Sequence, residues 1–135
     1  MALRPMLVGS MALVLMGWVA GAHAQDAATP TTISIALSEF KITPSTIALQ
    51  PNHPYTFHLT NLGGSGHSFS AKAFFKAVTA APASTEAVAD GTIEVPKVGA
   101  VDVTFVTGQA GEFEMHCTHP LHSTFGMKGK IVVGP

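Results

Sequence analysis

The sequence predicts an all-β protein, a sandwich or barrel of about eight short strands. From residue 31 onward, apolar and polar residues alternate with a period of two, which is typical of half-buried strands. Turn-forming Pro, Asn, Asp and Gly residues separate these runs at short intervals. The chain has 135 residues, of which 47% are hydrophobic and 11% charged, so it suffices for one domain with its own core.

The first 24 residues have the features of a secretory signal peptide. Arg4 precedes an apolar stretch, and a small-x-small motif ends at Ala24, as signal peptidase requires. Gly and Ser interrupt the apolar stretch, which is shorter than the roughly 20 residues of a membrane-spanning helix. We expect cleavage after Ala24, export to the periplasm and no stable membrane anchor. The rest of the chain then divides into a flexible tail and the folded domain, residues 25–30 and 31–135.

Each predicted strand is an alternating run that ends at turn residues. In the first run, Ile33, Ile35 and Leu37 alternate with smaller or polar residues, and the runs that include Tyr55 and Val101 repeat this pattern. The predicted strands are 33–37, 45–49, 55–61, 67–71, 92–95, 101–106, 111–117 and 128–133. Short strands at this spacing favour a sandwich or barrel over a parallel α/β sheet.

One segment, residues 71–83, interrupts the alternation. It is rich in Ala and places Phe74, Phe75 and Val78 at offsets that fit a helix. We therefore predict a short helix or packed flap there, followed by a loop to Asp90. We interpret it as a cover over one edge or end of the sandwich rather than as a lid over a ligand site.

Composition excludes several classes of function. Seven Lys and Arg against eight Asp and Glu give a net charge of -1, which provides no electrostatic basis for binding nucleic acid. The apolar fraction is too high and the charge too low for a disordered chain. A disulfide framework is impossible because the chain has one Cys, yet it has seven His. A single thiol in an exported protein therefore needs another explanation.

The segment 112–130 contains most of the residues that could bind a metal ion. Strand parity turns Cys117 toward the core at the end of a strand. The loop that follows offers His122 and Met127, and strand pairing can bring His67 beside them. A thiolate, a thioether and two imidazoles are the ligands of copper electron-transfer sites. Zinc gains nothing from a Met ligand, and calcium or magnesium would require oxygen donors.

The spacing Cys117-x4-His122-x4-Met127, with Gly66-His67 upstream, resembles that of the plastocyanin/azurin-type blue copper proteins, the cupredoxins. Within that family the loop is most similar to those of auracyanin and rusticyanin. Residues 38–44 are similar to the first-strand region of small periplasmic members, so the resemblance covers essentially the whole mature chain.

The resemblance implies that residues 31–135 form a Greek-key β-sandwich with one mononuclear type 1 copper ion. By analogy, His67, Cys117 and His122 are the equatorial ligands and Met127 is the axial ligand. The implied function is that of a periplasmic one-electron carrier, not an enzyme, which cycles between Cu(I) and Cu(II).

The ligand loop departs from the family pattern at several positions. Azurin-like loops often read Cys-Thr-Phe-Pro-Gly-His, whereas this loop has His119 in place of the Phe and Leu121 in place of the Gly. The family spacing favours His122 over His119 as the ligand. Ser68 takes the place of an Asn that ties the two ligand loops together in many relatives, and its hydroxyl offers a sparser tie.

Two other functions are compatible with the same residues. The first is a copper carrier or copper-resistance protein without a dedicated electron-transfer role, in which His116 and His119 form an additional transient site. The second is an enzyme with a Cys nucleophile, but a buried thiol beside a Met is a poor nucleophile. Thr118 follows Cys117, which gives no support for a trinuclear copper centre.

A redox partner, such as a cytochrome or a copper enzyme, is expected to dock near His122. Leu121 and Phe125 would then form an apolar docking patch, and the alternative is that they only pack the loop. His116 lies on the opposite strand face from Cys117, so it is expected at the surface or behind the ligands. We interpret the two remaining histidines of the domain, His53 and His58, as ordinary solvated side chains.

Overall fold

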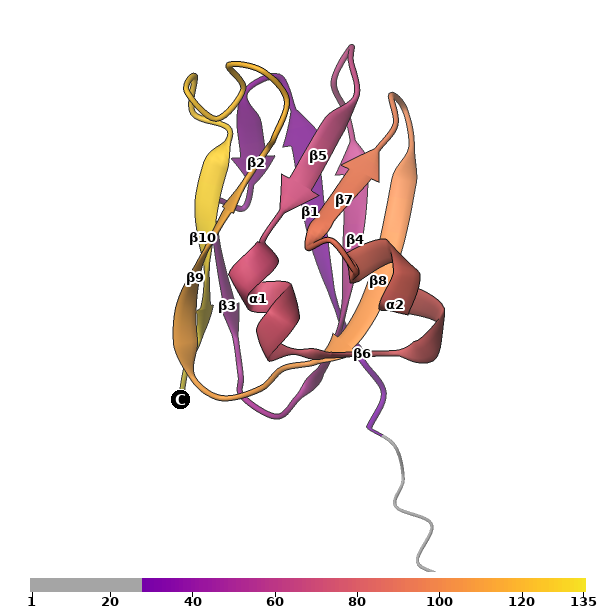
Figure 1. Cartoon of the computed structure of the whole chain (residues 1–135), viewed down its shortest axis with the longest axis vertical. Helices are drawn as coiled ribbons and strands as arrows, with labels where there is room; N and C mark the ends of the chain where they lie inside the picture. Colours follow the sequence, from indigo (N-terminus) through magenta and orange to yellow (C-terminus); the bar gives the residue numbers. More distant parts are fainter. Residues whose placement is uncertain (1–27) are drawn as a thin grey trace, which may run out of the picture.

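The computed structural model describes residues 28–135, which form two β-sheets packed face to face (Figure 1). The elements in chain order are β1 (Thr31–Ser38), β2 (Lys41–Thr43), β3 (Thr46–Leu49), β4 (Pro54–Asn61), β5 (His67–Ser70), α1 (Lys72–Ala77), β6 (Thr79–Ala80), the 3-10 turn η1 (Pro82–Ser84), α2 (Thr85–Val88), β7 (Thr92–Val95), β8 (Ala100–Val106), β9 (Gly111–His116) and β10 (Lys128–Val133). The predicted signal peptide, residues 1–24, and residues 25–27 of the predicted tail lie outside the described part. No helix within residues 28–135 is long and apolar enough to cross a membrane.

Each sheet has five strands and mixes parallel with antiparallel pairs. The first sheet has the order β2-β1-β4-β8-β6 and the second the order β3-β10-β9-β5-β7. β1 runs parallel to β4, and β10 runs parallel to β3. The predicted all-β sandwich is confirmed, and each of the eight predicted strands corresponds to an observed strand. The two strands that were not predicted, β2 and β6, are short edge strands of the first sheet.

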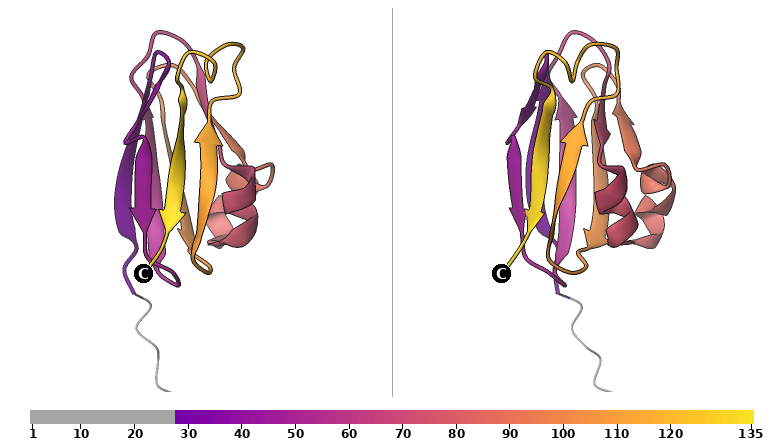
Figure 2. Two further views of the ribbon diagram at one scale, coloured as in Figure 1. Left: turned by 90° about the vertical axis from the view of Figure 1, so that its left-hand side faces the viewer. Right: turned by 60° about the vertical axis from the view of Figure 1, so that its left-hand side comes forward.

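The core lies between the sheets and is rich in Phe. β4 buries every second side chain, so Phe57 points inward and lies 4.8 Å from Phe105, measured between ring centroids. α1 adds Phe74, whose ring is stacked on Phe57 at 5.8 Å. Within the segment 71–83, predicted as a short helix or packed flap, α1 is the helix that closes the core along one side of the sandwich (Figure 2). The rest of that segment forms β6 and the start of η1, and the predicted loop to Asp90 contains the short helix α2 instead.

Besides the β7–β8 turn, three connections lie at the end of the sandwich opposite the C-terminus (Figure 1). They are the β1–β2 turn, the β4–β5 loop and the long β9–β10 loop, residues 39–40, 62–66 and 117–127. α1 and α2 lie lower along the body of the sandwich, away from this end (Figures 1 and 2). The sheets thus provide a rigid base on which loops from distant parts of the chain converge.

Candidate metal centre

The predicted ligands come from the first residue of β5 and from the β9–β10 loop. Cys117 directly follows β9 and is 1% exposed, which confirms that strand parity turns its thiol into the core. His67 is the first residue of β5 and is fully buried. His122 lies in the β9–β10 loop and is half-buried. β5 and β9 are neighbours in the second sheet, so sheet pairing brings His67 to the Cys117 loop.

Three donor atoms face one another at this end of the sandwich. His67 Nδ1 lies 3.2 Å from His122 Nδ1, and His122 Nδ1 lies 3.4 Å from Cys117 Sγ. All three lie within 4.8 Å of one another. Imidazole nitrogens and thiolates bind a metal such as zinc at about 2.0–2.3 Å, so donors that share one ion lie about 3–4 Å apart. The three side chains therefore fit a single metal ion.

Met127 is fixed beside this cluster by its backbone. Its N–H donates a hydrogen bond of 2.9 Å to the carbonyl oxygen of His122, and its carbonyl oxygen accepts one of 3.0 Å from the N–H of Cys117. The side chain is fully buried. The loop between Cys117 and Met127 is thus closed on itself by main-chain hydrogen bonds, which limit how far the two residues can separate.

Ser68 ties β5 to the β9–β10 loop through its hydroxyl, as the sequence leads us to expect. Its hydroxyl oxygen accepts a hydrogen bond of 2.8 Å from the N–H of Thr118 and lies 2.8 Å from the Thr118 hydroxyl. Its backbone N–H also donates to Cys117 Sγ at 3.4 Å, and its hydroxyl donates to the same sulfur at 3.7 Å. Donors to a ligand sulfur tune the redox properties of a metal centre.

The surroundings of His67 favour its neutral form. Burial lowers the pKa of His67 below its ordinary value of 6.5, while the nearby carboxylate of Glu39 opposes this effect. His122 and His119 lower the same pKa further. A metal binds neutral imidazole, so this environment keeps His67 ready as a ligand near neutral pH.

His119 lies at the edge of the cluster and is not one of the three donors. Its Nε2 is 3.0 Å from a carboxylate oxygen of Glu94. Its ring is stacked on that of His122, with centroids 5.4 Å apart and an interplanar angle of 22°. The structure thus brings His122, rather than His119, to Cys117, as the loop spacing predicts.

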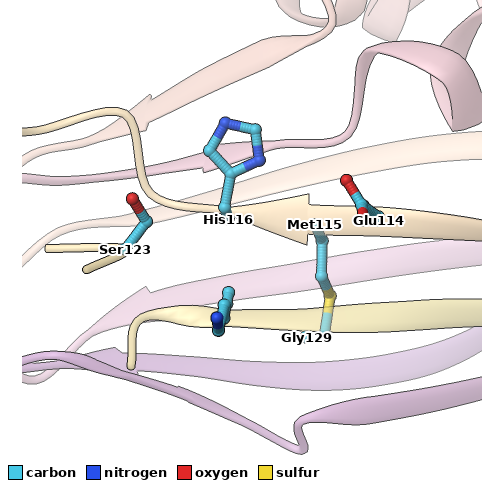
Figure 3. Close-up of a pocket in the computed structure, with 6 residues that line it drawn as sticks. Glu114, Met115, His116, Ser123 and Gly129 are labelled. Atoms are coloured by element: carbon cyan, nitrogen blue, oxygen red, sulfur yellow. The ribbon is translucent and has the colours of Figure 1, made fainter. Parts of the chain in front are cut away.

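His116 lies away from the three donors. It lines a groove of about 340 Å³ on the outer face of β9 and β10, together with Glu114, Ser123 and Lys128. Figure 3 shows its ring on the other side of β9 from the Met115 side chain, which runs toward Gly129. His53, in the turn before β4, contacts Thr31, and His58, on β4, contacts Asp102.

Exposed apolar side chains surround His122. Leu121 and Phe125, both predicted at this place, are 64% and 62% exposed. Phe40 from the β1–β2 turn joins them, because its ring lies 5.3 Å from the rings of both His122 and Phe125. We call Phe40, Leu121 and Phe125 the apolar rim. Phe40 is not predicted from the sequence. The one feature that marks it there is an aromatic residue directly after an acidic residue, Glu39.

Comparisons with known proteins agree with this architecture. A family model described as a cupredoxin-like domain matches residues 9–133. Among solved structures, the chain is similar to reduced auracyanin from Roseiflexus castenholzii, with 19% identity and a TM-score of 0.58, covering 80% of this chain and 100% of that one. Auracyanin A, a "blue" copper protein from Chloroflexus aurantiacus, gives 22% identity and a TM-score of 0.55, covering 78% and 100%.

A larger protein contains the same fold. A multicopper oxidase from Campylobacter jejuni is 13% identical with a TM-score of 0.59, and the match covers 81% of this chain but 31% of the oxidase. No curated protein matches the chain in sequence. At such low identities the solved structures establish the fold that the two sheets already display.

Proposed function

The chain belongs to the cupredoxin-like family, and from that premise we propose that it is a type 1 copper protein that carries single electrons. The observation that carries the proposal is the convergence of His67 Nδ1, Cys117 Sγ and His122 Nδ1 within 4.8 Å of one another. One thiolate and two imidazoles form the trigonal ligand set of copper electron-transfer sites, which a weak axial Met completes.

We propose that His67, Cys117 and His122 are the equatorial ligands and that Met127 is the axial ligand. Bound copper would supply one-electron chemistry between Cu(I) and Cu(II). The protein's part is to hold the ligands still: His67 is anchored in β5, and hydrogen bonds join Cys117 to both Met127 and Ser68. A site whose geometry changes little between two oxidation states exchanges an electron with little rearrangement. Ligands that are held still therefore favour fast electron transfer.

The apolar rim is the proposed contact for a redox partner. Its three side chains are 41%, 64% and 62% exposed, in the order Phe40, Leu121 and Phe125. Phe40 contacts the half-buried ring of His122, Phe125 contacts Phe40, and Leu121 directly precedes His122 in the chain. Contiguous apolar surface on a small soluble protein marks an interaction site. A cytochrome or a copper enzyme docked there would exchange its electron through His122. We propose the periplasm as the location, on the basis of the signal-peptide features of residues 1–24.

The test is a visible spectrum of the purified mature protein after addition of one equivalent of Cu(II). We expect an intense charge-transfer band from the Cys117 thiolate to copper, which Cys117→Ala abolishes. His119→Gln serves as the matched control, because it removes an imidazole from the same loop without removing a proposed ligand, and it should keep the band. A colourless wild-type protein with bound copper would refute the proposal.

A copper carrier that uses His116 and His119 as a transient site is the alternative. Within residues 28–135, neither residue belongs to the three-donor cluster, since His119 contacts Glu94 and His116 lines the groove on the outer face of β9. Electron exchange with a cytochrome distinguishes the two roles. Fast transfer of copper to a chelating protein without electron exchange would favour the carrier.

A further inference from the structure

The outer nitrogen of His67 lacks a hydrogen-bond partner. Nδ1 of this ring faces the other donors, while Nε2 points the opposite way and is buried. Among the buried side-chain nitrogen and oxygen atoms of residues 28–135, Nε2 of His67 is the only one without a hydrogen-bond partner. A carboxylate oxygen of Glu39, in the β1–β2 turn, lies 3.8 Å from it. That separation is within the range of an ionic interaction but too long for a direct hydrogen bond.

The chain holds Glu39 in this place. The N–H of Gly64 donates a hydrogen bond of 2.7 Å to the same carboxylate oxygen that faces His67. Gly63 keeps the space between the two groups open, because a Cβ on this residue would lie 2.5 Å from His67 Nε2 and 2.8 Å from Glu39 Oε1. The β4–β5 loop thus lets a negative charge approach the back of a buried imidazole.

The contact between the two imidazoles makes the position of one proton important. His67 Nδ1 and His122 Nδ1 are 3.2 Å apart, so a hydrogen bond between neutral rings needs a proton on one of these nitrogens and a lone pair on the other. His122 is half-buried and can exchange its protons with water. His67 is 0% exposed, so protein groups rather than water face its two ring nitrogens and set the relative free energies of its two tautomers.

We propose that Glu39 is a positioning residue that keeps the proton of His67 on Nε2, so that Nδ1 presents a lone pair to the metal; this inference rests on the proposed copper site. A carboxylate accepts and cannot donate, so it favours the tautomer whose N–H faces it. Carboxylates behind metal-binding histidines act in this way in other metal sites, fixing the tautomer and the ring orientation. Glu39 faces Nε2 rather than Nδ1, which separates this role from that of a direct ligand.

The first test is nitrogen NMR of the metal-free protein, at a pH well above the ordinary imidazole pKa of about 6.5. The ¹⁵N shifts of His67 report which ring nitrogen carries the proton. We expect the Nε2–H tautomer in the wild type and a shift toward Nδ1–H in Glu39→Ala. Glu39→Gln should give a smaller shift, because its amide oxygen still accepts the Gly64 hydrogen bond but the charge is gone.

Glu94→Ala and Glu94→Gln are the matched controls. Glu94 also places a carboxylate against an imidazole at this end of the sandwich, but its partner His119 is not a proposed ligand. These variants should leave the His67 tautomer unchanged. The thermal midpoints of all four metal-free variants show whether each one is folded as the wild type is.

The second test measures Cu(II) affinity by competition with a chelator. Loss of a group that orients a metal-binding histidine weakens metal binding about 10- to 100-fold, and we expect Glu39→Ala to lie in that range while Glu94→Ala stays near the wild type. An Nδ1–H tautomer in the wild type, or equal tautomers and affinities in Glu39→Ala and Glu94→Ala, would overturn the proposal. The NMR result does not depend on copper, so a colourless copper complex would refute the proposed function without deciding the role of Glu39.

Discussion

At the scale of one side chain, the proposed axial ligand Met127 can be tested by substitution, with Met115 as the comparison. Both are fully buried, but only Met127 lies in the loop of proposed ligands. Met127→Leu keeps the volume and burial nearly unchanged, so it should cost less than about 1.5 kcal/mol in the free energy of unfolding. It removes the thioether, which stabilises Cu(II) more than a hydrocarbon does, so we expect the reduction potential to rise. Cyclic voltammetry of the copper-loaded protein measures that change.

Met115→Leu is the control for this substitution, because it makes the same change of side chain in the sandwich core beneath the loop. It should alter the free energy of unfolding by a similar amount and leave the potential where it is. Equal potentials for the wild type and Met127→Leu would mean that the thioether contributes nothing to the centre.

At the scale of strands and loops, the regular elements were more predictable than the turns. Strand alternation reports burial directly, so it located the eight longer strands within two residues of their observed ends. β2 has three residues and β6 has two, too few for a period to be visible. Both exist because they pair with a longer strand, β2 with β1 and β6 with β8, and the sequence reveals such a neighbour only through the whole topology.

The same distinction applies to the candidate site. Cys117, His122 and Met127 share one loop, so their spacing alone indicated a common centre, and His67 followed from strand pairing. Glu39 and Phe40 lie in a turn far away in sequence, and their contacts with His67 and His122 exist only because two loops meet in space. No local sequence pattern shows that the side chains of a turn will contact residues far away in the chain.

The β9–β10 loop contains a residue with a strained backbone, which allows a second experiment. Leu121 has φ of +65°, a left-handed conformation that glycine adopts at lower cost, and the corresponding position of azurin-like loops is often Gly. Leu121→Gly should raise the free energy of unfolding of the metal-free protein by about 0.5–1 kcal/mol. It should also slow electron exchange with a cytochrome, because it removes one side chain of the apolar rim. Denaturant titration and stopped-flow kinetics measure the two effects.

Val98 is the matched control for Leu121. It has φ of +56° and is 83% exposed, but it lies in the loop between β7 and β8, outside the apolar rim. Val98→Gly should give a similar gain in stability and leave electron exchange unchanged. If Leu121→Gly were less stable than the wild type, the loop would owe its conformation to the packing of the Leu side chain rather than tolerate it.

For the molecule as a whole, the sheets, the helix and the ligand loops belong to one packed unit. Phe57 in the first sheet contacts Phe69 in the second and Phe74 in α1, with ring centroids 5.9 Å and 5.8 Å apart. Phe69 lies two residues after His67 on β5, so the core reaches the proposed metal centre through one short strand. Proton binding at His67 should therefore change the stability of the entire domain.

The sign of that dependence follows from the lowered pKa of His67. Burial lowers the pKa in the folded state, so between that value and about 6.5 the unfolded chain binds a proton that the folded chain rejects. The contribution of neutral His67 to the free energy of unfolding is then fully present above about pH 6.5 and is lost as the pH falls toward the folded-state pKa. In that range the free energy of unfolding falls by up to about 1.4 kcal/mol per pH unit. Denaturant titrations of the metal-free protein across this range measure the slope, and His67→Gln should reduce it. Equal slopes in the two proteins would show that acid destabilises the domain elsewhere, because the substitution removes this imidazole and leaves every other titratable group in place.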